Sequence, residues 1–401
     1  MRRRLLIVMC LAALVCSGLH AESGCSLGVT AGKASQLRTQ LQAVRLAEDM
    51  QDTVDPNVRR DIHALKDALA AVTDARMACT HDDSQGADAV QGDLAAALQA
   101  NQPPNNQVRA DAPVYGSSLV VNVQRTATSP AMLLVQWGFG IECGDDNLLL
   151  AYAFRNGSWL LLMRWQSKDY DKISDAYGDS FAYTALPGPT PRLVVFHGTP
   201  WCTSRWSGFG LDVLEPGKSV DTPHVLFHHG DGYVRGDFET VLKPRPDGFE
   251  LRVEVGMRDM DVMTRTGIFR YRIDGDRVTR VQPVAMNGRD FVDQWLQSKW
   301  PEASAWSDPA ALPALEHAHQ QLLALLDAKN DPASATFGPV RGCSDARDAY
   351  QVQLDLASGK SQDTTESRYF LIRSGANSFT LQAVLSTPSA QCKGGDLMKK
   401  G

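Results

Sequence analysis

Apolar residues between positions 33 and 100 recur at the spacing of helices, and alanine is frequent among them. One helical face collects Ile62, Leu65, Leu69 and Val72. The sequence Asp55-Pro56-Asn57 interrupts this pattern, and a proline at such a place predicts a turn. We therefore predict a helical hairpin in the region 22–100. A linker follows at 101–111, where NQPPNNQ contains two prolines and no apolar side chain besides them.

From Val114 onward the apolar positions recur every second residue, which is the period of a strand with one buried face. The stretch FELRVEV at 249–255 alternates without interruption. Residue pairs that tolerate positive φ predict hairpin turns at Asn156-Gly157, Asp247-Gly248 and Asp274-Gly275. Short strands joined by hairpins predict an antiparallel sandwich or barrel over 112–285, and no fixed-period repeat supports a propeller.

The stretch FHHGDGYVRGD, residues 227–237, allows two interpretations, a metal site and a turn. Adjacent strand residues point to opposite faces, so His228 and His229 cannot easily hold one ion. His224 and His228 share a face but lie roughly 13 Å apart along a straight strand. Gly230-Asp231-Gly232 has the composition that a tight hairpin prefers, so we predict a turn there between two strands.

Two amphipathic helices are predicted in the segment 286–330. The first gathers Phe291, Val292, Trp295 and Leu296 on one face, and the second aligns Leu315, Leu322, Leu323 and Leu326. His319 shares the second apolar stripe, whereas His317 lies about 200° away around the helix. We therefore interpret His319 as a core histidine with a hydrogen-bonding partner, and we predict no metal site.

A small antiparallel β unit is predicted at 331–393, which completes an α+β fold. Three strand-like stretches, YQVQLDL, RYFLIRS and FTLQAVL, lie between Cys343 and Cys392. A unit of this size has too little core to be stable alone, so we expect a disulfide between the two cysteines. Residues 394–401 contain glycine and lysine and are predicted to form a disordered tail.

Residues 1–21 have the pattern of a secretory signal peptide. Three arginines precede an apolar run from Leu5 to Cys16, and the small residues Gly18 and Ala21 offer cleavage positions. The run is shorter than the roughly 20 apolar residues of a membrane-spanning helix. We therefore expect a periplasmic or secreted protein without a transmembrane segment in its mature chain.

The charge balance argues against a nucleic-acid partner. The net charge of −6 becomes −9 once the signal segment leaves, because its three arginines are its only charged side chains. Nucleic-acid binding usually requires a basic balance or a clustered basic face, and the sequence contains neither.

Cysteine usage also fits an exported protein. Two of the eight cysteines belong to the signal segment, and the remaining six have long spacings without a C-x-x-C pair, which favours disulfides over zinc. Antiparallel helices place Cys25 near Cys79, and the C-terminal unit pairs Cys343 with Cys392. The predicted disulfides are therefore Cys25–Cys79, Cys343–Cys392 and, by elimination, Cys143–Cys202.

The predicted Cys143–Cys202 disulfide joins two loops, FGIECGDDN and HGTPWCTSRWSGFG, that follow neither helix nor strand periodicity. Loops fixed by a rigid element often carry function. Together they bring the residues of a candidate ligand site to one edge of the sheet: Glu142, Asp145, Asp146, His197, Trp201, Arg205 and Trp206. Exposed tryptophans beside charged groups suit a sugar or peptide ligand. In the alternative interpretation, the tryptophans fill the end of the β unit and the charges are solvated.

Enzyme signatures are absent from the sequence, and no motif predicts a cofactor. The acidic loop at 169–180 departs from a calcium-binding loop, because Ile173 and Ser174 stand where a ligand and a glycine are needed. We expect a non-enzymatic module that binds an extracytoplasmic protein or a small ligand. One alternative is a hydrolase that uses His197 with the carboxylates of the first loop. The other is a structural envelope component that docks through the helical hairpin.

Overall fold

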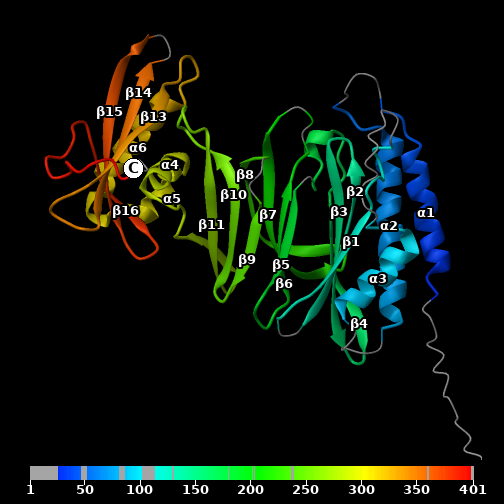
Figure 1. Cartoon of the computed structure of the whole chain (residues 1–401). Coiled ribbons are helices and arrows are strands. Elements are labelled where there is room, and N and C mark those ends of the chain that lie inside the picture. The colour runs from blue at the N-terminus through cyan, green and yellow to red at the C-terminus, as the bar shows by residue number, and fades with distance from the viewer. Residues whose placement is uncertain are drawn as a thin grey trace, which may run out of the picture.

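Helical layers and four-stranded sheets succeed one another along the molecule (Figure 1). The computed structural model describes residues 26–46, 52–80, 86–101, 113–128, 131–178, 180–200, 202, 204–235, 239–358 and 361–398. Within these ranges the strands form four antiparallel sheets, and each sheet contains four consecutive strands in meander order. The fold is therefore α+β, as the sequence predicted.

Three helices form the first layer: α1 (Gly28–Gln42), α2 (Pro56–Ala78) and α3 (Ala87–Leu98). The Asp55 side chain caps α2 by accepting a hydrogen bond from the Asn57 N–H, and Pro56 occupies the first turn, where its missing N–H does not matter. The predicted break is thus confirmed. The prediction of a two-helix hairpin is incomplete, because a third helix, α3, packs against α1, α2 and the neighbouring strand β1.

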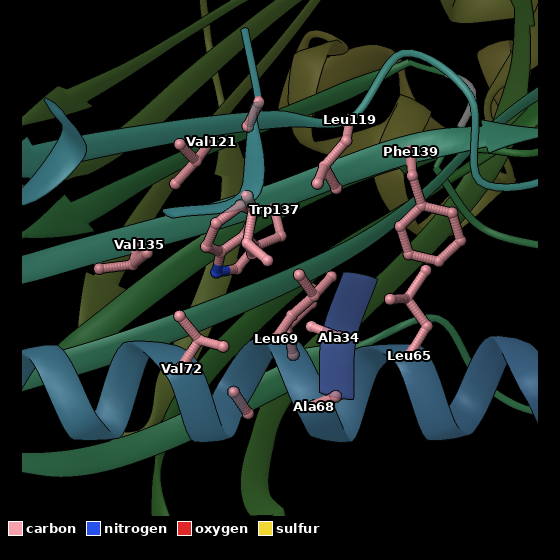
Figure 2. Packing of buried hydrophobic residues seen from close by; sticks show 14 of the residues in the cluster. Ala34, Leu65, Ala68, Leu69, Val72, Leu119, Val121, Val135, Trp137 and Phe139 are labelled. Atoms are coloured by element: carbon pink, nitrogen blue, oxygen red, sulfur yellow. The ribbon is translucent and has the colours of Figure 1, made fainter. Parts of the chain in front are cut away.

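The first sheet comprises β1 (Val120–Arg125), β2 (Met132–Ile141), β3 (Gly144–Arg155) and β4 (Ser158–Gln166). Figure 2 shows Leu65, Leu69 and Val72 of α2 directed at Val135, Trp137 and Phe139 of β2. Met132 and Leu134, on the other face of β2, pack in a second core with Leu193 and Val195 of the next sheet. Because both faces are covered, β2 is buried along its whole length.

The second sheet contains β5 (Phe181–Leu186), β6 (Arg192–Gly198), β7 (Trp206–Ser219) and β8 (Thr222–Val234). The third contains β9 (Val241–Arg245), β10 (Gly248–Gly256), β11 (Thr264–Asp274) and β12 (Arg277–Val281). Phe196 and Leu211 of the second sheet share a core with Phe249 and Leu251 of the third. The region 112–285 is thus a stack of three sheets, and a single sandwich or barrel is not confirmed.

Hairpin turns confirm the local predictions at three places and contradict one. Asn156 and Gly157 adopt positive φ of 53° and 80° between β3 and β4. Turns also join β9 to β10 and β11 to β12 at the predicted positions, within one residue. The turn predicted at Gly230-Asp231-Gly232 is wrong, because these residues lie inside β8. Their pairing with β7 keeps them extended, and the real turn is at 220–221.

The C-terminal unit packs helices on one face of the fourth sheet. The helices are α4 (Gly288–Gln297), α5 (Trp300–Ala303) and α6 (Leu312–Leu326), and the strands are β13 (Ser334–Gly342), β14 (Ala349–Ser358), β15 (Ser361–Ser374) and β16 (Phe379–Leu385). His319 is buried, and its Nε2–H donates to the carbonyl oxygens of Trp295 and Ser298, 3.1 Å away in each case. The core-histidine interpretation is confirmed. The unit has four strands instead of three, because β13 precedes Cys343.

The predicted tail is ordered as far as Met398. The Leu397 N–H donates to the Val340 carbonyl at 2.9 Å, and the Val340 N–H donates to the Asp396 carboxylate at 3.1 Å. These bonds attach the tail to the outer edge of β13, so the prediction of disorder is wrong for 394–398. Residues 399–401 lie outside the described residues.

Two of the three predicted disulfides, Cys143–Cys202 and Cys343–Cys392, are present. The third stays a prediction, since Cys25 and the signal segment 1–21 lie outside the described residues, as does all of the linker except Asn101. Among the helices that the structure describes, none combines the length and apolar character needed to cross a membrane.

Candidate functional site

Asp146, one of the predicted ligand-binding residues, is buried in the protein interior. Its carboxylate and Lys66 of α2 are both fully buried, with Lys66 Nζ 3.3 Å from Asp146 Oδ1. The ammonium also donates to the Ser167 carbonyl at 3.1 Å, and the Tyr170 hydroxyl donates to Asp146 Oδ2 at 3.2 Å. This carboxylate therefore joins the helical layer to the first sheet and is not open to a ligand.

His197 is buried between the first and second sheets. Its Nε2–H donates to Asp212 Oδ2 at 3.0 Å, and its Nδ1 has no partner. Asp212 also accepts from Nδ1 of the exposed His228, at 2.6 Å. Burial alone would raise the pKa of Asp212, but the hydrogen bonds and charges of the two histidines hold it below its ordinary value. The His197 side chain is only 1% exposed and its Nε2 is occupied by Asp212, so the imidazole does not reach the surface, where a substrate would bind.

The other predicted residues have different surroundings. Glu142 accepts a hydrogen bond from the Tyr115 hydroxyl at 3.4 Å, and burial raises its pKa. Glu142 also lies close to both sulfur atoms of the Cys143–Cys202 bond, but disulfide sulfurs do not ligate a metal as thiolates do. Asp145 is exposed on β3, and Arg205 donates to the Arg235 carbonyl at 3.1 Å. Trp201 lies outside the described residues.

Trp206 is the predicted residue that lines a large cleft, with a volume of about 870 Å³. We call it the β8 cleft and define it by its three walls. The β7–β8 wall includes Trp206, Gly208, His229, Gly230, Asp231 and Gly232. Strands β10, β11 and β12 contribute Gly256, Arg265, Phe269 and Arg280. Helices α4 and α5 with their connection contribute Gln294, Gln297, Lys299 and Glu302.

Trp206 is 48% exposed, which is unusual for so large an apolar side chain. Its indole lies against the backbone of β10 at Gly256. A Cβ atom at this glycine would come within 2.8 Å of the ring. The glycine therefore lets the indole rest on the strand and leaves about half of it open to the cleft.

Two arginines are fixed in the cleft walls by acidic partners on the helices. Arg280 binds Glu302 at 2.9 Å and lies over the Phe269 ring, 4.5 Å from its centroid. Arg265 donates from Nε to Asp293 at 2.5 Å and from Nη2 to Gln294 at 3.0 Å. Since these bonds connect the third sheet to α4 and α5, the polar groups hold their positions without a ligand.

Asp231 is an exposed acid on the β8 side of the cleft. It accepts a hydrogen bond from the Gly232 N–H at 2.7 Å, and its other oxygen is 3.7 Å from His229 Nε2. Burial alone would raise the pKa of Asp231. The interaction with His229, the hydrogen bond of Gly232 and the charge of Arg280 lower it overall.

Four glycines leave bare backbone where β7 and β8 pair. Gly208 lies opposite Gly232, and Gly210 lies opposite Gly230. A Cβ atom at Gly230 or Gly232 would have no neighbour closer than 3.6 Å, so both positions face open space. Gly230 and Gly232 lie in a strand and not in the turn that their composition predicts. The i, i+2 spacing in both GFG and GDG was the available signal, since strand glycines often mark the close approach of a ligand or another backbone.

The acidic loop before β5 is held by ion pairs. Arg59 of α2 contacts both Asp169, at 3.6 Å, and Asp171, and His63 lies 3.5 Å from Asp169. These carboxylates therefore have protein partners, and Asp179 lies outside the described residues.

No known protein-family model matches the chain, and no curated protein matches it.

Proposed function

We propose that this chain is a non-enzymatic binding protein of the extracytoplasmic space and that its ligand occupies the β8 cleft. The observation that carries the proposal is a half-exposed indole at a cleft whose charged side chains are already fixed by ion pairs. Fixed polar groups lose little conformational entropy when a ligand arrives, which favours binding.

The size and composition of the β8 cleft support a ligand rather than a solvated gap. Ligand sites typically have volumes of about 300–1,000 Å³ and combine apolar surface with a few placed polar groups. The cleft, at about 870 Å³, falls in this range and carries Trp206, Phe269, Arg280 and Glu302 on its three walls. An aromatic face contributes both contact area and attraction for cations or polarised C–H groups.

Cysteine chemistry supports a location in the extracytoplasmic space. The two disulfides fit an oxidising environment, and the pattern of residues 1–21 fits export. The bond of Cys143 to Cys202 also fixes the loop that leads to Trp206, so reduction is expected to loosen one wall of the site.

The test screens the full chain against two kinds of probe, an oligosaccharide array and a library of linear random peptides displayed on phage. A ligand found by either screen is then titrated against wild type and Trp206→Ala. We expect at least about tenfold weaker binding by the variant, because stacking on an indole and its buried area contribute over about 1.4 kcal/mol.

Leu160→Ala is the matched control, since Leu160 is 46% exposed on β4 and does not line the β8 cleft. It should bind like wild type. Failure of both screens, or equal binding by wild type and a folded Trp206→Ala protein, would overturn the proposed function.

A further inference from the structure

We propose that the ligand is an extended polypeptide segment that pairs with β8 and becomes the fifth strand of the β5–β8 sheet. This inference rests on the proposed function and specifies the ligand class for the same cleft. The partner is a protein with an exposed, flexible segment, recognised mainly through its main chain.

The position of β8 in the sheet leaves one side of it unpaired. The strand order is β5-β6-β7-β8, so in the part of the chain that the structure describes β8 is an edge strand, paired with β7 alone. Gly230, Asp231 and Gly232 are all exposed although they lie in the interior of the strand. Edge strands offer a row of main-chain donors and acceptors to another chain.

The hydrogen bond of Gly232 shows which groups point outward. Its N–H donates to the side chain of Asp231 at 2.7 Å, so it is directed away from β7. In a strand the N–H and C=O groups of alternate residues point the same way. The main-chain groups of Gly230 therefore face outward as well, while those of Asp231 face Phe209 of β7.

The glycines make this edge accessible from the sides. Neither Gly230 nor Gly232 has a side chain, and the opposing residues on β7 are glycines too. A neighbouring strand must approach to about 4.8 Å, and bare backbone removes the steric resistance to it. The Asp231 carboxylate occupies the Gly232 N–H until a peptide carbonyl replaces it.

The location of this edge favours a single strand of another protein over a second copy of the chain. Proteins usually protect exposed edges with charged side chains or bulges. Here the 230–232 segment lines a cleft that is also lined by Gln297, Lys299 and Glu302 of α4, α5 and their connection. The cleft volume of about 870 Å³ suits a single extended segment and is too small for the edge of a second sheet with its flanking layers.

The charges and the indole around the edge set the chemistry of the peptide. Trp206 offers a flat apolar surface, while Lys299 is an exposed cation and Glu302 is bound to Arg280. Side chains of an added strand alternate between two faces. We therefore expect a segment in which an aromatic or aliphatic residue alternates with polar residues, at least one of them acidic.

The test uses peptides selected from the phage-displayed library on the full chain, with affinities measured by fluorescence anisotropy. Gly232→Pro removes the outward N–H, and edge strands tolerate proline where the N–H faces solvent. Gly232→Ala keeps the N–H, and its Cβ meets nothing closer than 3.9 Å. We expect at least about tenfold weaker binding by the proline variant and a change below about twofold for alanine.

A second measurement does not depend on any variant folding. N-methylation of the selected peptide, one residue at a time, should weaken binding to the wild-type chain at every second position. This period of two arises because only alternate N–H groups of an added strand face β8.

Several outcomes overturn the inference. If Gly232→Ala weakens binding as much as Gly232→Pro, the ligand lies on the face of the sheet. A methylation profile without the period of two also excludes strand addition. Dimerisation of the chain that Gly232→Pro abolishes would identify a second copy as the occupant. If only oligosaccharides bind, and Trp206→Ala loses them, the inference fails while the proposed function stands.

Discussion

Replacing Lys66 with methionine would leave the buried carboxylate of Asp146 without its counter-charge. Methionine keeps most of the apolar length of lysine, so the packing of α2 against the first sheet changes little. Both charged groups are fully buried, with Nζ 3.3 Å from Oδ1. Removing one partner of a buried ion pair costs about 3–5 kcal/mol, because the remaining charge is desolvated without compensation. We therefore expect Lys66→Met to lower the free energy of unfolding by about 3–5 kcal/mol.

The assay is urea-induced unfolding followed by circular dichroism, with native-state hydrogen exchange of the α2 amides as a local readout. Arg60→Met is the matched control on the same helix, because Arg60 is 69% exposed and its pair with Asp61 should contribute only about 0–1 kcal/mol. The double variant Lys66→Met/Asp146→Asn should be more stable than Lys66→Met, since it removes the unpaired charge. A cost of Lys66→Met no larger than that of Arg60→Met would refute the reasoning.

Two further predictions concern His319 and the glycines. Burial lowers the pKa of His319 in the folded chain. As the pH drops through the ordinary pKa of 6.5, the unfolded chain therefore binds more protons than the folded one. The free energy of unfolding should fall in this pH range. His319→Leu should remove this part of the pH dependence, and identical slopes for both proteins would contradict it. Gly178→Ala should destabilise by about 1–3 kcal/mol, because Gly178 has a φ of +136° and its Cβ would lie 2.3 Å from the Asp145 carbonyl oxygen. Gly92→Ala, on the open surface of α3, should instead stabilise by about 0.5–1 kcal/mol, and a lower melting temperature would argue against this.

Local features of the sequence determined several elements directly. Asn156-Gly157 determines the hairpin between β3 and β4, because the turn requires positive φ at two successive residues and asparagine and glycine both adopt it. The apolar stripe that includes His319 predicted both helix α6 and its buried face, because residues three or four positions apart share one face of a helix. The pairing of Cys343 with Cys392 followed from the size of the unit that they close.

The candidate site could be predicted only in part, because its members come from distant segments. The sequence indicated Trp206 through its aromatic loop, but Gly256, against which the indole lies, is on another sheet. Asp146 looked like a loop carboxylate, and its partner Lys66 is 80 residues away in the chain. Neither the burial of a charge nor the identity of its partner can be recognised from neighbouring residues alone.

Gly230-Asp231-Gly232 shows most clearly what the tertiary structure decided. Its glycines and aspartate are typical of a turn, but glycine also adopts the extended conformation of a strand, so local preferences do not distinguish a turn from a strand. Pairing with Gly210 and Gly208 selects the strand, and the packing of Phe209 and Tyr233 between the second and third sheets fixes the register. The sequence by itself determined those segments whose residues allow one local conformation, such as the turn at Asn156-Gly157. Only the stacking of the layers decided which of them pair and which edge stays open, because burial on both faces is a property of the assembled chain.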